Sequence, residues 1–444
     1  MTDKLLYTFF NKNLPEIKKG RGIYLYEKSG TRLTDLTGGS TGHAILGWGN
    51  KSINNSIVKQ LNNISHIDYK YWKDNNRTLL ANLILSNKIN KLDKVFFVGS
   101  SGAEACEAAT KLSYQVHCSN GNSKKNLIIS RKQSYHGCTS QTIALGDRPN
   151  LSFYKNILNK NVIKINEHNL IRHKKKNETE EQYAERSASE LEKKIISIGA
   201  DRVGSFVAET MAGGLIGDVP PAKNYWKKIR KICTKYDVHL ILDEVWCGTG
   251  VSGKYFCIDY DQITPDFIFI GKTLSAGYGA LSAVITKKIL FNNIEKYSGQ
   301  IQYSNTHQGH SLSVAAALAA QKIINNNFFL EKVIKKGELL RDILNSELSH
   351  HEFFVNVRGR GLRNSFEYKC INQNLFGNTL KNILRKEDKI LIDSKWHRIC
   401  FSPSLAITKK EIHENLEKII KKFKLLSKNW TYIKTNKLTS GKYF

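Results

Sequence analysis

The chain has 444 residues, of which 41% are apolar and 24% are charged, a composition typical of a globular protein with a large core. No stretch approaches the roughly 20 consecutive apolar residues that span a bilayer, and the N-terminus lacks the pattern of a signal peptide, so a cytoplasmic location is expected. The eight cysteines include no C-x-x-C pair, which argues against a metal site or a disulfide framework.

Basic residues dominate the charge. Lysine and arginine outnumber aspartate and glutamate by 68 to 39, which gives a formal net charge of +29. Such an excess raises the question of binding to nucleic acid or to an anionic surface. The lysines are spread along the whole chain, however, and no zinc-finger, RNP-like or basic-zipper pattern accompanies them. A solvated basic surface is the preferred interpretation, and a nucleic-acid-binding protein is kept only as a remote alternative.

Short apolar segments alternate with amphipathic stretches, a pattern typical of an α/β domain with a mostly parallel sheet. A helix is expected over 103–117, where small apolar residues recur at helical spacing. Because several predicted strands are apolar throughout, helices are expected on both faces of the sheet. The strands are expected at 94–99, 126–131, 204–210, 238–245, 266–272 and 281–286.

The later part of the chain indicates a second, smaller unit. Residues 172–194 form a charged insertion that ends as a helix, and a long helix begins near Ser311. Beyond that helix, the segment 355–368 and a second helix over 407–426 have the appearance of an α+β domain.

Ionisable side chains follow two of the predicted strands. Asp243 and Glu244 lie near the end of the segment VHLILDEV, after its apolar residues, and Lys272 follows FIFI after one glycine. Ligands of open α/β sheets bind beyond the carboxyl ends of the strands, so both positions are site candidates. A lysine removed from water there has a lowered pKa and supplies a neutral amine for Schiff-base chemistry. A carboxylate beside a pyridine nitrogen keeps that nitrogen protonated, as pyridoxal phosphate requires.

Two turns add to this pattern. The segment VGSSGAEACEAA, residues 98–109, is a strand, a Gly/Ser turn and a helix whose first amides favour an anion. In SYHGCTSQTIALG, residues 134–146, Tyr135 and His136 lie in a turn where an aromatic ring can stack on a flat cofactor. Taken singly, each turn also fits an ordinary loop.

Together these motifs closely resemble the class III aminotransferases, pyridoxal-phosphate enzymes of fold type I, and are nearest to their ω- and amine-transaminase-like branches. The resemblance runs from Gly22 to about Lys422. It implies a large cofactor-binding domain over 61–317 with a mostly parallel seven-stranded sheet, and a smaller α+β domain built from residues 1–60 and 318–444. It rests on GSSGAEACEAATKLS, SYHG, AET, LILDEVWCGTGVSG, PDFIFIGKTLSAGYGALSAV, NTHQGHSLSVAAALA and VRGRGL.

The resemblance also implies which residues contact the cofactor ring. Lys272 would hold pyridoxal phosphate as a Schiff base and move the proton during turnover. Asp243 would pair with the pyridinium nitrogen. Val245 and Tyr135 would contact the two opposite faces of the ring, and His136 would lie next to Tyr135 in the cofactor site.

Other residues would bind the cofactor at its edges. Thr306 matches a threonine that reaches the phosphate from the neighbouring subunit, which implies a homodimer with active sites at the interface. Glu209 matches a glutamate near the cofactor that commonly pairs with a substrate-binding arginine or another polar group. The phosphate of the same subunit would be bound by Ser101, Gly102 and Ala103.

The substrate site departs from the family. Cys400 stands where the arginine that binds the substrate carboxylate is usual, which favours a substrate whose amine is distant from any carboxylate. Arg398, two residues earlier and on the same strand face, either supplies a carboxylate clamp from a shifted position or is a surface residue. Trp48, in the segment 34–50 that lines the substrate entrance, is a candidate wall residue, although ordinary packing explains it as well.

The sequence therefore predicts an aminotransferase with a ping-pong mechanism. A small-molecule amino donor leaves its nitrogen on the cofactor, and an oxo acid or aldehyde collects it. A decarboxylating transaminase, an aminomutase, a racemase and a phospho-lyase remain open as alternatives, because the shared cofactor carries out the bond chemistry. A nucleotide-binding Rossmann enzyme is disfavoured, since no G-x-G-x-x-G follows the first strands.

Overall fold

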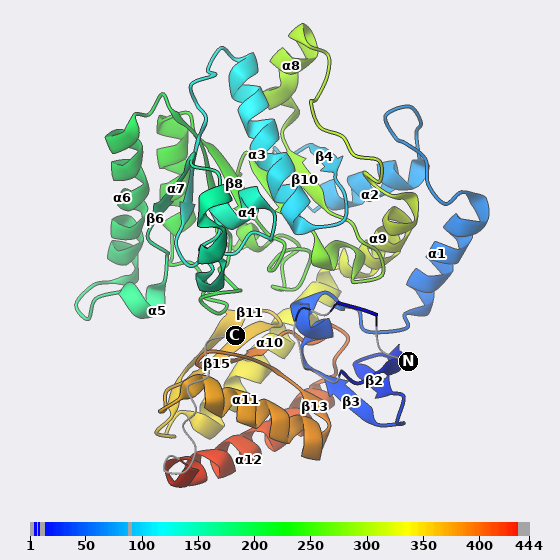
Figure 1. The fold of residues 1–444 in the computed structure, drawn as a ribbon, viewed down its shortest axis with the longest axis vertical. Coiled ribbons are helices and arrows are strands. Elements are labelled where there is room, and N and C mark those ends of the chain that lie inside the picture. Colours follow the sequence, from blue (N-terminus) through cyan, green and yellow to red (C-terminus); the bar gives the residue numbers. More distant parts are fainter. Residues whose placement is uncertain (1–3, 7, 9–13, 88–90, 434–444) are drawn as a thin grey trace.

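The computed structural model describes residues 4–6, 8, 14–87 and 91–433 (Figure 1). A seven-stranded sheet with the order β4-β10-β9-β8-β7-β5-β6 lies at its centre. The strands from β9 to β6 pair in parallel, and β10 runs antiparallel to both of its neighbours. The expected mostly parallel, seven-stranded sheet is confirmed. Its strands are β4 (Lys94–Phe97), β5 (Leu127–Arg131), β6 (Val162–Ile165), β7 (Val203–Glu209), β8 (His239–Asp243), β9 (Phe267–Ile270) and β10 (Ala283–Thr286).

The central strands are buried along their whole length, as their apolar sequences predict. Every residue of β7, β8 and β9 is buried. The six predicted strand segments all lie in this sheet, whereas β6 lies outside them. It is an edge strand of the sequence VIKI with mostly half-buried residues, so it lacks the continuous apolar pattern of the strands inside the sheet.

Helices cover the sheet on both faces (Figure 1). The alanines of α3 at 105, 108 and 109 are fully buried, which lets this helix pack closely on the strands. The helices of this part of the chain are α1 (Lys51–Asn63), α2 (Asn75–Leu85), α3 (Gly102–Ser119), α4 (Ser140–Leu145), α5 (Leu170–His173), α6 (Glu180–Ile198), α7 (Tyr225–Lys235), α8 (Asn292–Tyr297) and α9 (Ser311–Ile324).

Two four-stranded sheets lie below the large sheet in the view of Figure 1. In the first, β13 (Ile390–Leu391) pairs in parallel with β3 (Arg32–Asp35), so the N-terminal and C-terminal segments share one sheet. This sheet has the order β1-β2-β3-β13, with β1 at Ile17–Arg21 and β2 at Tyr24–Glu27. The second has the order β11-β12-β15-β14, and its strands are β11 (Phe354–Arg360), β12 (Arg363–Tyr368), β14 (Asp393–Lys395) and β15 (Arg398–Phe401).

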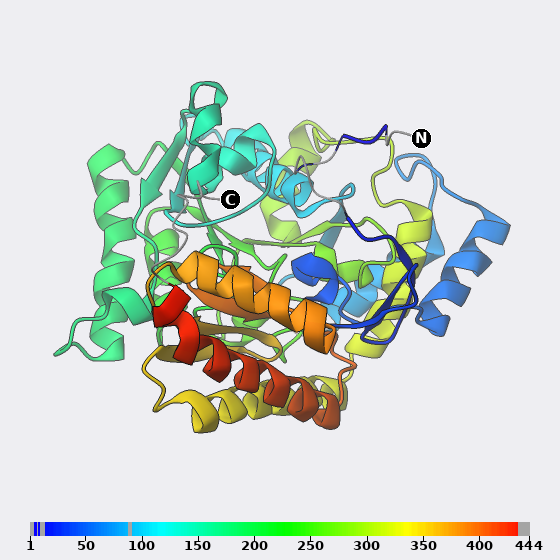
Figure 2. The same cartoon turned by 60° about the horizontal axis from the view of Figure 1, so that its bottom comes forward.

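Three helices run side by side on the outer surface of this smaller part (Figure 2). They are α10 (Asn327–Leu348), α11 (Gln373–Ile383) and α12 (Lys409–Ile433). We propose the two-domain division that the sequence suggested, with its boundaries at 60/61 and 317/318 falling inside α1 and α9. These two helices pack together, since the Ser56 hydroxyl donates a hydrogen bond to the Ala315 carbonyl at 2.9 Å.

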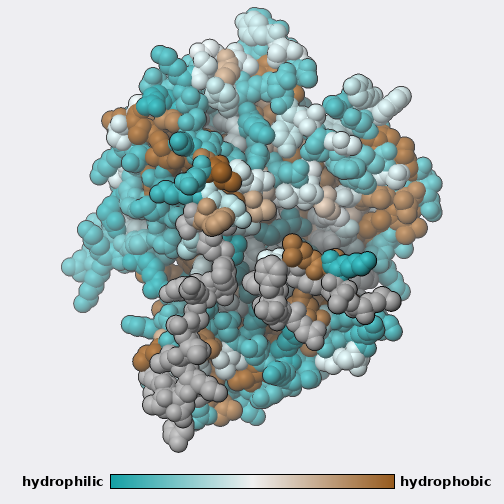
Figure 3. Space-filling view, viewed as in Figure 1, coloured by the Kyte–Doolittle hydropathy of each residue, from teal (hydrophilic) through white to brown (hydrophobic). Residues whose placement is uncertain are grey.

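The face of the molecule in Figure 3 is mostly hydrophilic, with apolar side chains gathered over α1 at one edge. Across residues 14–87 and 91–433, no helix combines the length and the apolar character needed to cross a membrane.

Candidate functional site

Three ionisable side chains lie at the carboxyl ends of adjacent strands. Glu209 ends β7 and Asp243 ends β8, and the two residues are direct partners in the register of these parallel strands. Lys272 follows β9, with only Gly271 between the strand and the lysine. The edge of the sheet thus carries two carboxyl groups and one amine, as the sequence predicts for Asp243 and Lys272.

Asp243 is fixed by its neighbours. It is only 5% exposed, and its Oδ2 lies 2.8 Å from Nδ1 of His136. Its Oδ1 accepts a hydrogen bond from the Val245 amide at 2.9 Å. The other ring nitrogen of His136, Nε2, is buried and has no hydrogen-bond partner among the described residues. One polar atom next to the carboxylate therefore remains available to a ligand.

Lys272 lies in a conformation that costs energy. It begins a 3₁₀ turn with a φ of +35°, in the left-handed region that favours glycine. Removal from water lowers the pKa of the amine, Arg363 and Lys395 lower it further, and the Asp243 carboxylate opposes this shift. The lowered pKa enlarges the neutral, nucleophilic fraction of the amine.

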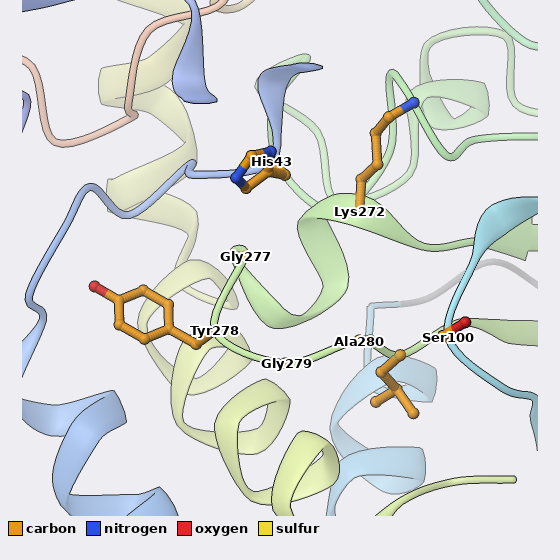
Figure 4. A pocket seen from close by; sticks show the side chains of 8 residues that line it. His43, Ser100, Lys272, Gly277, Tyr278, Gly279 and Ala280 are labelled. Atoms are coloured by element: carbon orange, nitrogen blue, oxygen red, sulfur yellow. The ribbon is translucent and has the colours of Figure 1, made fainter. Parts of the chain in front are cut away.

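A cavity of about 300 Å³ adjoins Lys272 (Figure 4). His43 contributes to its wall from the N-terminal segment, and Ser100 contributes from the turn before α3. Residues 277–281, which follow the 3₁₀ turn of Lys272, complete the lining. The cavity thus lies between Lys272 and the turn that precedes α3.

Glu209 is buried beside Asp243. It is 5% exposed, and its Oε2 has no hydrogen-bond partner among residues that the structure describes. Burial, with a contribution from the Asp243 charge, raises the pKa of this carboxyl to about 8, although Arg131 and Lys272 lower it. At neutral pH the group is therefore mostly protonated and able to donate a hydrogen bond.

The start of α3 lies close to the same edge. Ser101 caps the helix: its hydroxyl accepts from the Glu104 amide at 3.3 Å, and the Glu104 carboxylate accepts from the Ser101 amide at 3.1 Å. The first-turn amides at Gly102 and Ala103 have no intrahelical acceptor. A Cβ on Gly102 would lie 2.7 Å from a methyl group of Val245, so only glycine allows this close approach. The amides are thereby held near Val245.

Other predicted residues have mixed environments. Tyr135 is half-buried, and burial raises its pKa. Trp48 is half-buried, with its ring edge-to-face against His43 at a centroid distance of 6.0 Å. Thr306 is exposed in the segment between α8 and α9, and its carbonyl oxygen lies 2.9 Å from His66 Nε2.

Arg398 and Cys400 are both buried in β15, with exposed fractions of 0% and 5%. The alternative that Arg398 is a surface residue is therefore wrong. Its side chain lies under the loop after β7, where it donates a hydrogen bond to the Gly214 carbonyl at 2.9 Å. The Cys400 sulfur lies 3.7 Å from the oxygen of Ser365, whose hydroxyl donates to Asp218 at 2.7 Å.

Sequence reasoning missed a cluster around Trp246. The Nζ of Lys272 lies 5.6 Å from the centre of the Trp246 ring, the Arg363 guanidinium 4.2 Å and the Lys395 Nζ 5.9 Å. The indole N–H donates to Asp218 at 2.7 Å. The only sequence feature that could have indicated a site role for Trp246 is its position directly after Asp243, Glu244 and Val245. Nothing in the sequence pattern links Arg363 or Lys395 to it.

These groups fit pyridoxal phosphate. The amine of Lys272, the fixed carboxylate of Asp243 and the amides at the start of α3 are the three kinds of group that an aldehyde, a pyridine nitrogen and a phosphate require. The unpartnered atoms of His136 and Glu209 provide further hydrogen-bonding capacity at the same edge of the sheet.

Comparisons with known proteins agree with this chemistry. The model of the family aminotransferase class-III matches residues 10–423. The chain is 30% identical over 433 residues to an uncharacterized aminotransferase of Schizosaccharomyces pombe, with 94% of each protein covered. It is 33% identical over 361 residues to gamma aminobutyrate transaminase 2 of Solanum lycopersicum, with 79% of this chain and 77% of that protein covered.

The fold has solved counterparts as well. The structure is similar to that of the omega transaminase from Pseudomonas jessenii in complex with PMP, with a TM-score of 0.87 and 26% identity over 94% of this chain and 93% of that chain. The chain belongs to the class III aminotransferases and is a pyridoxal-phosphate-dependent transaminase, which moves an amino group between an amino donor and an oxo acid or aldehyde.

Proposed function

We propose that Lys272 is the residue that holds pyridoxal phosphate, as a Schiff base, and that its amine also moves the proton in each half-reaction. The observation that carries this proposal is the meeting of Lys272, Asp243 and Glu209 at one edge of the sheet, beside a cavity. Pyridoxal phosphate, when bound, draws electrons away from the bonds next to the amino nitrogen. A lysine with a lowered pKa is suited to accept and return a proton there.

We assign the remaining cofactor contacts in the same way. Asp243 would hold the ring nitrogen in its protonated form, and the bond from His136 at 2.8 Å would keep this carboxylate in place. Tyr135 and Val245 would contact the ring faces. The protonated Glu209 would donate a hydrogen bond at the edge of the ring.

The phosphate would lie at the start of α3, against the amides of Gly102 and Ala103 and near Ser101. We propose a homodimer in which Thr306 reaches the phosphate of the partner subunit, because Thr306 is exposed on its own chain. Apolar side chains exposed on and just after α1 support an interface there: Val58, Leu61 and Ile64 are 55%, 54% and 45% exposed (Figure 3).

Two assignments complete the proposal. Trp48, packed against His43 of the cavity wall, would form part of the substrate entrance. A cytoplasmic location is supported by Cys247 and Cys257, which lie in one buried cluster and are both thiols.

The first test replaces the proposed covalent anchor. Lys272→Ala should lower turnover with amine donors and pyruvate or 2-oxoglutarate by at least about 10³-fold, because both the link to the cofactor and the proton carrier are lost. It should also abolish the visible absorbance of the lysine-bound cofactor. Lys254→Ala, which removes an exposed lysine, should keep both properties. Normal turnover in Lys272→Ala would contradict the assignment of Lys272 as the cofactor-binding residue.

The second test uses the titration of Glu209. Its pKa of about 8 in the folded protein lies above the ordinary value of 4.5, so between these values the folded state binds a proton that the unfolded state releases. This contribution to stability is complete below pH 4.5 and is lost as the pH rises through 8.

In cofactor-free protein, the free energy of unfolding should therefore fall more steeply with pH over this range in the wild type than in Glu209→Gln, by up to about 1.4 kcal/mol per pH unit. Denaturant titrations at several pH values measure the difference. Glu185→Gln, at an exposed carboxyl, should keep the wild-type slope. Equal slopes for wild type and Glu209→Gln would refute the buried, protonated carboxyl.

The third test concerns the dimer. The wild type should sediment with twice the mass of the 50.5 kDa chain, and Leu61→Glu should shift it to the monomer with loss of bound cofactor. Leu425→Glu is a matched control, because Leu425 has the same exposed fraction of 54% but lies on α12. If the wild type were fully active as a monomer, an active site shared between two subunits would be excluded.

A further inference from the structure

Two cysteines outside the cavity form a buried pair. Cys247 lies in the segment after β8, and Cys257 begins the 3₁₀ turn Cys257–Tyr260. Both side chains are fully buried in a small cluster with Met211, and both are thiols. The Cys247 thiol donates a hydrogen bond to the Cys257 sulfur, so the two sulfur atoms are neighbours. Two thiols in direct contact are the arrangement from which a disulfide forms.

The surroundings of Cys257 favour its thiolate. Nη1 of Arg360 lies 3.7 Å from the Cys257 sulfur. The hydrogen bond from Cys247, helped by the Arg360 charge, lowers the pKa of the Cys257 thiol to about 7, although burial and a nearby carboxylate oppose this shift. In the equally buried Cys233, by contrast, burial raises the pKa of the thiol to about 12. The thiolate is the reactive form of cysteine, so Cys257 is the nucleophile of the pair.

Cys257 lies just beneath the surface of the molecule. Its neighbour Arg360 has 16% of its side chain exposed, and the guanidinium carbon of Arg360 lies 4.4 Å from the centre of the Tyr260 ring. Tyr260 is itself 37% exposed. Hydrogen peroxide is little larger than water, so a small local opening at these two side chains is enough to admit it to the thiolate.

The pair is connected to the proposed active site through Cys247. The Cys247 sulfur lies 3.9 Å from the carbonyl oxygen of Asp243. The preceding residue is Trp246, whose ring centre lies 5.6 Å from Nζ of Lys272. A covalent bond holds two sulfur atoms far closer than a hydrogen bond between thiols does, so a disulfide moves Cys247, Cys257 or both. A shift of Cys247 changes the position of the Trp246 ring next to the amine.

The backbone of Cys257 is anchored more firmly than its side chain requires. The Glu244 carboxylate accepts a hydrogen bond from the Cys257 amide at 2.7 Å and another from the Ile258 amide at 2.8 Å. Glu244 is fully buried, so these bonds lie away from water, where they are strong. We therefore expect the closing of a disulfide to displace chiefly Cys247, on the side of the active site.

We propose that Cys247 and Cys257 are a redox switch: hydrogen peroxide joins them in a disulfide that lowers transaminase activity, and a thiol reductant restores both thiols and activity. The loss of activity rests on the proposed function, because it acts through Trp246 on the amine of Lys272. The formation of the disulfide depends on the two cysteines and their neighbours alone.

Peroxide alone balances the reaction. The Cys257 thiolate attacks one peroxide oxygen, the O–O bond breaks, and the hydroxide that leaves takes up the proton lost by this thiol and becomes water. The sulfur of Cys247 then attacks the sulfur of the resulting sulfenic acid. The S–S bond forms, the S–O bond breaks, and the leaving hydroxide takes the Cys247 proton as a second water. Each sulfur loses one electron, and peroxide gains the two.

The test treats the holoenzyme with hydrogen peroxide, blocks the remaining free thiols by alkylation and digests the protein with trypsin without reduction. Lys254 separates the two cysteines, so a disulfide appears in mass spectrometry as the peptides 236–254 and 255–272 joined together. The joined peptides should increase with peroxide while kcat falls by roughly 10-fold or more, and dithiothreitol should reverse both changes. Complete inactivation without the joined peptides would overturn the proposal, and so would joined peptides with unchanged activity.

Two variants separate the pair from the other cysteines. Cys257→Ser should keep the activity of the untreated enzyme and lose most of its response to peroxide. Cys233→Ser is the matched control, because Cys233 is equally buried but has a raised pKa, and it should respond as the wild type does. Inactivation that persists in Cys257→Ser would place the sensitive group elsewhere, such as the exposed Cys138, and contradict the switch.

The outcomes also separate this inference from the role of Lys272. The disulfide is detected by mass, so its formation is measured whether or not Lys272 holds the cofactor. If Cys257→Ser does not fold, the wild-type measurement decides, because the joined peptides and the loss of activity must appear and disappear together. Normal turnover in Lys272→Ala contradicts the proposed function and leaves the disulfide intact, whereas the lack of joined peptides in inactivated wild type contradicts only the switch.

Discussion

The register of β7, β8 and β9 is the constraint on which the site depends. Pairing in parallel sets Glu209 beside Asp243, and places Lys272 two residues beyond the end of the neighbouring strand β9. Because these strands are buried on both faces, a shift of register would displace apolar side chains along their whole length. The packing of the core therefore fixes the spacing of two acids and an amine whose charges would otherwise be unfavourable in such a place.

The site is electrostatically incomplete without its ligands. His136 Nε2, Glu209 Oε2 and two nitrogens of Arg398 are buried polar atoms without partners in the described chain. Large cores tolerate a few such atoms, because the apolar surface they bury offsets the cost. The first two atoms adjoin the residues that would hold the cofactor, and the nitrogens of Arg398 lie on β15.

The sequence predicted the sheet from its apolar strands. It also predicted Asp243 and Lys272 as site residues, because an ionisable residue directly after an apolar strand can be recognised from its sequence neighbours alone. The strand β6 was not predicted, because Lys164 interrupts the short apolar pattern of this edge strand. Strand alternation predicts that Arg398 and Cys400 lie on the same face of their strand. It does not predict which segments cover that face, so the complete burial of Arg398 could not be predicted. The contacts of Trp246 with Arg363 and Lys395 depend on segments more than 100 residues apart, and no local pattern encodes them. The roles of the individual site residues remain predictions.

The central claim is that one lysine among the many of this basic chain carries the cofactor. Hydride reduction of the holoenzyme, followed by proteolysis and mass spectrometry of the peptides, tests it most directly, because reduction converts the bond between an amine and an aldehyde into a stable one. The account predicts a single modified peptide with the pyridoxyl group on Lys272. Modification of a different lysine, or of none, would contradict it.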